Sequence, residues 1–161
     1  MRVEDVRVTL AEPMAQELMA ARIPARLAYT ALDGTPRVVP MGYAWTGSAL
    51  VMATVAKAPK VAALEANPVV ALTVDTNEQP PHVLLVRGTT SIEIVDGVPD
   101  VFLDGARKLV APEAWEGFEA GVRALYDRMA VLTVTPTWAR LYDFETRVPD
   151  VVAKQAAARG L

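Results

Sequence analysis

The spacing of hydrophobic and polar residues predicts a protein that mixes strands and helices. Six stretches have the short, Val-rich pattern of strands, namely residues 23–32, 37–45, 49–55, 69–75, 82–95 and 130–144. Helical spacing of apolar residues occurs in 11–21, in 59–67, twice within 99–129, and in 151–159. Because several strands are joined by tight turns, the pattern does not fit a doubly wound parallel sheet, which needs a helix after nearly every strand. It favours a small antiparallel barrel with helices outside.

Turn and breaker residues refine this outline. Asp33 and Gly34 predict a tight hairpin between the first two strands. Pro40 and Gly42 cannot both occupy a regular ladder, so we expect a bulge there or a close approach of the backbone to a ligand. Gly88 should bend the long fifth strand. Asn67, just before a proline, is placed to take a left-handed conformation at the end of its helix.

Two aromatic patterns predict buried faces. The second helix within 99–129 carries a stripe on one face, formed by Trp115, Phe118, Val122 and Tyr126. Such a stripe is more typical of a core than of a cofactor site. In the last strand, alternation is expected to place one set of side chains on one side, namely Leu132, Val134, Trp138, Tyr142 and Phe144.

The amino-acid composition limits the kinds of site that the chain can form. A chain of 161 residues fits one domain. It has no cysteine and a single histidine, His82, which excludes disulfides, thiol nucleophiles, cysteine-ligated metals and histidine clusters. The net charge is −3, no apolar run is long enough to span a membrane, and the first residues do not match a secretory signal. We therefore expect a soluble cytoplasmic protein with no metal site and no nucleic-acid or membrane partner.

The start of the helix at Pro59 is unusual. Pro59 suits the first helical position, but Ala58 before it offers no capping side chain, where Ser, Thr, Asp or Asn would contribute about 1 kcal/mol. Lys57 and Lys60 add positive charge at the positive end of the helix dipole. Two interpretations remain open from these residues: the lysines extend into water, or the helix start binds an anion such as phosphate.

Four segments of the chain together resemble the pyridoxamine 5′-phosphate oxidase-like split β-barrel family of flavin and deazaflavin proteins. They are YTALDGTPRVVPMGYAW, LVMATVAKAPKVAALEANPVVALTVD, VLLVRGTTSIEIVDG and LTVTPTWARLYDF, and they cover almost the whole chain. The resemblance implies an α+β fold, a six-stranded antiparallel split β-barrel with flanking helices, as a single domain over residues 1–161. It also implies a homodimer with cofactor sites at the interface, and FMN or the deazaflavin coenzyme as cofactor.

The resemblance also implies roles for particular residues. Ala53, Thr54, Lys60, Asn67 and Pro68 match the family's phosphate-binding segment, and Val38, Val39, Pro40 and Met41 match the strand beside the cofactor ring. Lys57 and Lys60 would contact the phosphate, because Ala58 and Pro59 replace the Ser and Arg of many members. Arg87 could face the cofactor or be a solvated strand residue. Trp138 matches a position that reaches the partner's cofactor in some members, although a lone Trp in an alternating strand is more often core.

The expected function is that of a flavin- or deazaflavin-dependent oxidoreductase acting on a small molecule. The cofactor carries the hydride, so no catalytic side chain is required of the protein. Authentic vitamin B6 oxidases contact their substrate through a carboxy-terminal Arg and His, whereas this last strand ends in YDFETR without a histidine. Oxidation of pyridoxamine phosphate is therefore not expected. The alternatives are a non-catalytic flavin or deazaflavin carrier, and a dimeric interaction module without cofactor.

Overall fold

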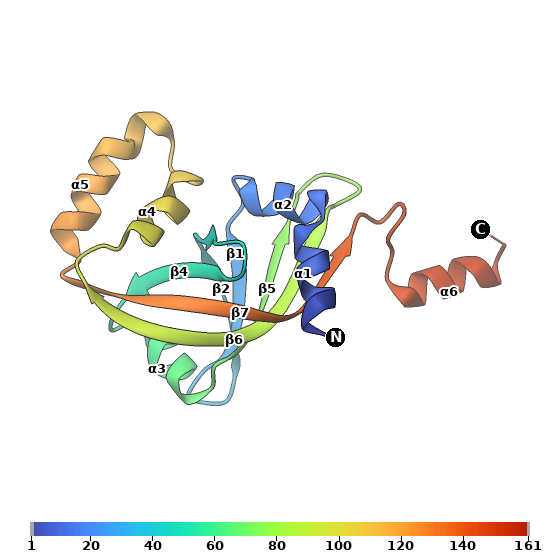
Figure 1. The fold of residues 1–161 in the computed structure, drawn as a ribbon, viewed down its shortest axis with the longest axis horizontal. Helices are drawn as coiled ribbons and strands as arrows, with labels where there is room; N and C mark the ends of the chain where they lie inside the picture. The colour runs from blue at the N-terminus through green and yellow to red at the C-terminus, as the bar shows by residue number, and fades with distance from the viewer. Residues whose placement is uncertain (1, 161) are drawn as a thin grey trace.

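A computed structural model describes residues 2–160 and shows one antiparallel sheet flanked by helices (Figure 1). The strands are β1 (Ala25–Thr30), β2 (Pro36–Met41), β3 (Ala44–Trp45), β4 (Leu50–Val55), β5 (Val69–Asp75), β6 (Val83–Asp96) and β7 (Arg128–Tyr142). The helices are α1 (Val3–Ala11), α2 (Pro13–Ala20), α3 (Pro59–Ala66), α4 (Asp100–Arg107), α5 (Trp115–Leu125) and α6 (Asp150–Ala158), with a 3₁₀ turn, η1 (Pro112–Ala114), before α5. The strand order β2-β1-β5-β6-β7-β4-β3 places the long strands β6 and β7 in the interior of the sheet. The predicted α+β class is confirmed.

The predicted strand over residues 37–45 is two strands, so the count of six strands was wrong. Pro40 keeps its place in β2 opposite Arg26, and the ladder stops at Met41. A Cβ on Gly42 would lie 3.3 Å from the backbone of Gly105 in α4, so this glycine permits two backbones to meet. Tyr43 is fully buried behind it. The close approach expected at Gly42 is therefore made by a helix of the same chain.

A bulge bends the central pair of strands, as Gly88 predicted. Gly88 is opposite Pro136 whereas Arg87 is opposite Trp138, so β7 carries one extra residue at this point. A Cβ on Gly88 would lie 2.4 Å from the carbonyl oxygen of Thr135, which leaves room only for glycine.

The bulge also changes which face of β7 is buried. Leu132 and Val134 are buried before it, and Ala139 and Leu141 are buried after it. Trp138 is therefore on the face opposite to Leu132, and the single alternation predicted for the whole strand was wrong. The extra residue reverses the period of two. Phe144 lies beyond the end of the strand, with φ 59°.

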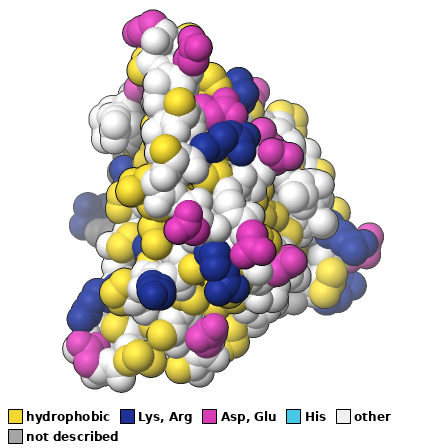
Figure 2. Space-filling view, turned by 90° about the vertical axis from the view of Figure 1, so that its left-hand side faces the viewer, with side chains coloured by type: hydrophobic (Ala, Val, Ile, Leu, Met, Phe, Trp, Pro, Cys, Tyr) yellow, Lys and Arg dark blue, Asp and Glu magenta, His cyan; other side chains and the backbone are white. Residues whose placement is uncertain are grey.

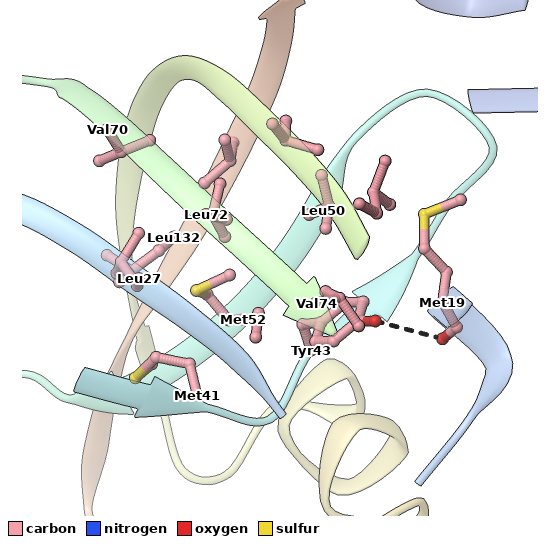
Figure 3. Packing of buried hydrophobic residues seen from close by; sticks show 14 of the residues in the cluster. Met19, Leu27, Met41, Tyr43, Leu50, Met52, Val70, Leu72, Val74 and Leu132 are labelled. Carbon is pink, nitrogen blue, oxygen red and sulfur yellow. Dashed lines mark hydrogen bonds between the residues drawn. The ribbon is translucent and has the colours of Figure 1, made fainter. Parts of the chain in front are cut away.

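Two hydrophobic clusters lie on opposite faces of the sheet. The larger one, the inner cluster, gathers Leu27, Met52, Leu72 and Leu132 from four strands, and their side chains converge in Figure 3. Helix α3 covers it through Val61 and Leu64. The smaller one, the outer cluster, contains Ala53, Met129, Leu103 of α4 and Val122 of α5. The strands β4 and β7 contribute side chains to both clusters and are thus covered on both faces. Burial of each large apolar side chain contributes about 1.5–3 kcal/mol.

Two proline-linked details differ from prediction. The helix expected over 11–21 is α2, and the helix α1 that precedes it was not predicted. Glu12 between them is extended because a residue before proline avoids the helical region. Asn67 is extended for the same reason, with φ −141° rather than the predicted left-handed conformation.

The carboxy-terminal helix α6 projects from the rest of the chain, at the end opposite to α4 and α5 (Figure 1). It has no buried residue, and Val151 is 71% exposed. The helix predicted over 151–159 is confirmed to within one residue at each end. None of the helices formed by residues 2–160 is long and apolar enough to cross a membrane.

Candidate functional site

The start of α3 has the uncapped geometry that the sequence predicted. Ala58 is the extended residue before the helix and makes no capping hydrogen bond through its side chain, and Pro59 is the first helical residue. The first turn closes when the N–H of Val61 donates to the carbonyl of Ala58 at 2.9 Å. The strand β4 ends at Val55, so the segment that links it to α3 lies at one end of the sheet.

Lys60 points back from α3 to β4. Its Nζ donates a hydrogen bond to Oγ1 of Thr54 at 3.2 Å. The side chain is half-buried, and this burial lowers the pKa of Lys60 because the charged form loses hydration. Lys57 is exposed. Within residues 2–160, neither lysine has a carboxylate at ion-pair distance, so both charges are available to an anion.

An apolar cavity of about 330 Å³ lies between the ends of β2 and β4 and the helices α4 and α5. The residues that line it are Pro40, Met41, Gly42, Ala53, Thr54, Val55, Phe102, Ala106, Leu109, Val110, Phe118, Tyr126 and Met129. Only Thr54 and Tyr126 bring polar side-chain atoms to it. Phe102 stacks on Phe118 with centroids 6.2 Å apart, and meets Tyr126 edge-on at 6.3 Å. The wall is thus aromatic and uncharged.

A second hollow, the lysine groove, adjoins the apolar cavity and measures about 620 Å³. It is lined by Val55, Ala56, Lys57, Ala58, Pro59, Val61, Ala62, Glu65, Ile94, Leu125, Tyr126, Asp127 and Arg128. Val55 and Tyr126 line both hollows, so the two are neighbours across these side chains. Figure 2 looks onto this end of the molecule and shows hydrophobic side chains exposed among basic and acidic ones.

Helix α4, the roof of the apolar cavity, is fixed to the body of the protein by several contacts. A Cβ on Gly105 would lie 2.8 Å from the backbone nitrogen of Tyr43. The ammonium of Lys108 donates to the carbonyl of Met19 at 2.9 Å and lies 3.7 Å from the centre of the Tyr43 ring. The Tyr43 hydroxyl meets the same Met19 carbonyl (Figure 3). Burial lowers the pKa of Lys108 and raises that of Tyr43.

Most of the predicted site residues come together at this end of the sheet. Pro40, Met41, Ala53 and Thr54 line the apolar cavity, and Lys57 lines the lysine groove. Lys60 joins them through its hydrogen bond to the Thr54 hydroxyl. Val39 is different, because its side chain packs against the inner cluster and lines neither hollow.

Arg87 and Trp138 form a separate pair on the outer face of the sheet. They are opposite each other on β6 and β7, and the Arg87 guanidinium lies 4.4 Å from the centre of the Trp138 ring. From Arg87 to Ile94, which lines the lysine groove, the chain is extended for seven residues, about 23 Å. One copy of the chain therefore does not bring this pair to the two hollows. Trp138 is half-buried on the outer face and does not belong to the core.

No separate sequence signal marked the residues that α4 and α5 contribute to the apolar cavity. The stripe of α5 predicted a core, and Val122 is buried in the outer cluster as expected. Phe118 and Tyr126 pack against this cluster and also line the apolar cavity. Helical spacing identifies such a face but cannot distinguish a wall of a cavity from a core, because both are apolar.

The chain matches a known protein family and several solved structures. The family model described as Pyridoxamine 5′-phosphate oxidase matches residues 11–143. No curated protein matches the chain significantly. A solved structure of an F420 reductase is 30% identical, with 78% of this chain and 94% of that one covered and a TM-score of 0.60.

More distant structures share the fold. General Stress Protein 26 from Bacillus anthracis is 17% identical, with coverage of 84% of this chain and 96% of that one and a TM-score of 0.59. An FAD-binding protein from Mesorhizobium loti is 23% identical, with coverage of 80% and 91% and a TM-score of 0.51.

Proposed function

The chain belongs to the pyridoxamine 5′-phosphate oxidase family, and from this premise we propose that it is an oxidoreductase that uses a flavin or a deazaflavin. The observation that carries the proposal is the pair of adjoining hollows, one apolar and aromatic, the other lined by Lys57 at an uncapped helix start. The F420 reductase that resembles this chain at 30% identity supports the same class of cofactor.

The residues present fit a cofactor with a flat ring and an anionic tail. The apolar cavity has an aromatic wall and a volume within the range of small-molecule sites. The cations that would meet a phosphate, Lys57 and Lys60, have no carboxylate partner within residues 2–160. A charged oxygen accepting from these ammonium groups would form the strong class of hydrogen bond.

We assign roles to the residues accordingly. Lys57 and Lys60 hold the phosphate, and Thr54 orients Lys60 by accepting its hydrogen bond. The backbone of residues 39–41 lies beside the ring, which the aromatic side chains of α4 and α5 shield from water. When bound, the cofactor itself supplies hydride transfer, so the chain needs only to bind, orient and exclude solvent.

The expected substrate is a small molecule other than pyridoxamine phosphate. The apolar cavity has no charged side chain to receive a phosphorylated amine. After β7, the chain turns through residues 143–147, where Asp143 accepts hydrogen bonds from the Thr146 hydroxyl and from backbone N–H groups. Arg147 in this turn pairs with Glu12. These groups are engaged in holding the turn.

We further propose that the protein is a homodimer and that its sheet forms the split barrel of this family. The outer face of β2, β1 and β5 exposes Val38 at 65% and Val69 at 59%. Arg87 and Trp138 share this face, as the strand registers require. A second copy on this face would cover the valines and would bring the pair toward the partner's site, which one chain does not do.

Spectroscopy of the purified protein tests the function directly. We expect bound flavin or deazaflavin absorbance, with the molecule identified by mass analysis, and loss of affinity when Lys57 and Lys60 are both replaced by alanine. A colourless protein that shows no thermal shift with FMN or the deazaflavin coenzyme would overturn the proposal. To separate an enzyme from a carrier, reoxidation of the bound reduced cofactor by an added acceptor is compared with reoxidation in free solution.

A further inference from the structure

We propose that the carboxy-terminal helix α6 is an arm that docks onto helix α1 of a second copy of this chain. The two helices belong to the end of the molecule opposite to α4 and α5, away from the proposed cofactor site (Figure 1). The inference rests on the homodimer proposed above and not on the cofactor. It assigns a partner to a helix that one chain leaves uncovered.

Helix α6 is too short to be stable without packing. It has nine residues, whereas isolated helices shorter than about 12–15 residues are marginal in water. No residue of α6 is buried, and Val151 and Val152 are 71% and 45% exposed. A helix of this length gains most of its stability from tertiary contacts, and its own chain does not provide them.

The turn that precedes α6 is held by its own side chains. Asp143 accepts hydrogen bonds from three backbone N–H groups and from the Thr146 hydroxyl. Arg147 pairs with Glu12, which lies between α1 and α2. Phe144 has φ 59°, a conformation that residues other than glycine rarely adopt. The turn thus fixes the direction in which α6 leaves the sheet, and this direction is away from the body of the chain (Figure 1).

A groove beside α1, the α1 groove, has a size that suits α6. It measures about 650 Å³. From Val3 to Leu10 it extends about 10 Å along α1, and α6 is about 12 Å long from its first residue to its last. Its apolar walls include Val3, Val6, Leu10, Trp45, Ala49 and Pro136.

The charges of the two helices are complementary when the helices lie antiparallel. On α1, Arg7 follows Glu4 by three residues, and on α6, Lys154 follows Asp150 by four, so each pair shares one helix face. An antiparallel arrangement brings Arg7 to Asp150. It also brings Glu4 to Lys154, and it opposes the two helix dipoles. A parallel arrangement would bring like charges together. Within residues 2–160, Glu4, Arg7 and Lys154 have no ion-pair partner.

The occupant of the α1 groove is a second copy because the turn directs α6 away from its own chain (Figure 1). Asp150 lies 3.8 Å from Arg140, and the Arg140 guanidinium is 5.8 Å from the centre of the Trp138 ring on the outer face. Helix α6 therefore begins beside the face on which the homodimer is proposed. In a two-fold dimer each copy gives one arm and receives one, which closes the assembly. Nine residues are too small a surface to hold a dimer alone, so the arm adds to that interface.

Cross-linking tests where α6 lies. The chain has no cysteine of its own, so an introduced cysteine is the only thiol. Full-length Val3→Cys and Val151→Cys chains are mixed in equal amounts and treated with a short bismaleimide, and the linked peptides are identified by mass spectrometry. Each chain then carries one thiol, so every link joins two copies. We expect the link between the unlike chains to form at least fivefold faster than when Val8→Cys replaces Val3→Cys.

Val8 is the matched control for this experiment. It is also on α1 and is 63% exposed, against 68% for Val3, but it does not line the α1 groove. Equal rates for the two positions, or no link between unlike chains of a protein that is dimeric, would overturn the inference and leave the homodimer standing. A monomeric wild-type protein would overturn both.

Charge reversal tests the antiparallel pairing. Lys154→Glu should weaken dimerisation about fivefold at low salt, measured by sedimentation on dilution, because it places an acid beside Glu4 of the other copy. Adding Glu4→Lys should restore the wild-type dissociation constant. Adding Glu113→Lys instead gives the same net charge at an exposed residue before α5 and should not restore it. An unchanged dissociation constant in Lys154→Glu, or equal restoration by the two second substitutions, would contradict the pairing.

Discussion

Lys60 is held in a half-buried position by one hydrogen bond to a neutral hydroxyl, that of Thr54. Its pKa is lowered by desolvation, which means that the ammonium is less stable there than in water. The residue therefore destabilises the cofactor-free protein slightly and gains a charged partner only when an anion binds. A lysine with an unfavourable half-buried charge and no carboxylate partner is more typical of a binding site than of a structural ion pair.

Replacement of this side chain should have opposite effects on stability and on binding. Lys60→Met should raise the melting temperature of the cofactor-free protein by up to about 2 °C at pH 7, because a charge is no longer buried. It should weaken binding of a phosphate-bearing flavin about tenfold, the loss of one charged hydrogen bond. Scanning calorimetry and fluorescence titration measure the two effects. Lys57→Met, at an exposed position, is the control and should leave the melting temperature unchanged.

The stability difference between the wild-type protein and Lys60→Met should change with pH in a definite direction. Because the pKa of Lys60 is lower in the folded protein, the unfolded chain binds more protons as pH rises through the folded pKa toward 10.5. Wild-type stability relative to Lys60→Met should therefore increase in that window, and the advantage of the variant at pH 7 should shrink. An advantage that stays constant up to pH 10.5 would argue against a buried charge.

Local chemistry predicted the residues at the start of α3 well. Pro59 and Ala58 have the positions that their lack of N–H and of a capping side chain predicts. The positions of residues that meet across different strands could not be predicted in the same way. Trp138 lies on the outer face beside Arg87 because of a register shift, which depends on how two strands pair and is not visible in either strand alone.

Among the elements, the bulge in β6 and β7 determines which side chains face the core. Gly88→Ala would place a methyl group 2.4 Å from a backbone oxygen, so one of the strands would have to move. We expect a loss of about 2–3 kcal/mol in the free energy of unfolding, measured by urea denaturation.

The α5 glycine Gly121 provides the control for this substitution. A Cβ there would meet no atom within 4 Å, so Gly121→Ala should be neutral or stabilise by up to about 1 kcal/mol through helix propensity. Equal effects of the two substitutions would mean that the bulge does not depend on glycine.

Helix α4 depends on a second close contact. Gly105→Ala would place a methyl group 2.8 Å from the backbone of Tyr43, which would displace α4 and the roof of the apolar cavity. We expect a loss of about 2 kcal/mol in stability and flavin binding weakened severalfold. Near-ultraviolet circular dichroism during thermal unfolding measures the stability, and fluorescence titration measures the flavin affinity. Gly117→Ala is the matched control, because a Cβ there would meet no atom within 4 Å. If Gly105→Ala left flavin binding unchanged, the proposed role of α4 as a wall of the cofactor site would be contradicted.

The elements themselves were largely predictable, and their interruptions were not. Strand patterns and turn residues located β1, β4, β5 and α3 closely, because these depend on neighbours along the chain. The division between β2 and β3 arises where Gly42 meets Gly105, residues distant in sequence. Only tertiary packing specifies such a contact.

At the scale of the whole molecule, the outer sheet face is a surface that one chain leaves exposed. If the proposed homodimer forms there, Val38→Glu combined with Val69→Glu should convert it to a monomer, because each charge would be buried without a partner. Light scattering at several concentrations measures the change. Leu32→Glu is the control, since Leu32 is 70% exposed in the turn after β1 and outside this face. A monomeric wild-type protein would contradict the proposal.

The edge strand β2 has one more property that follows from its sequence. A sheet edge normally offers a row of backbone N–H groups to any other extended chain, which invites aggregation. β2 carries prolines at positions 36 and 40, and each removes one of those donors. The prolines that interrupt a regular strand pattern therefore also make this edge a poor template. We expect the protein to remain free of fibrillar aggregates at high concentration, and Pro36→Thr with Pro40→Thr to increase thioflavin T fluorescence on prolonged incubation.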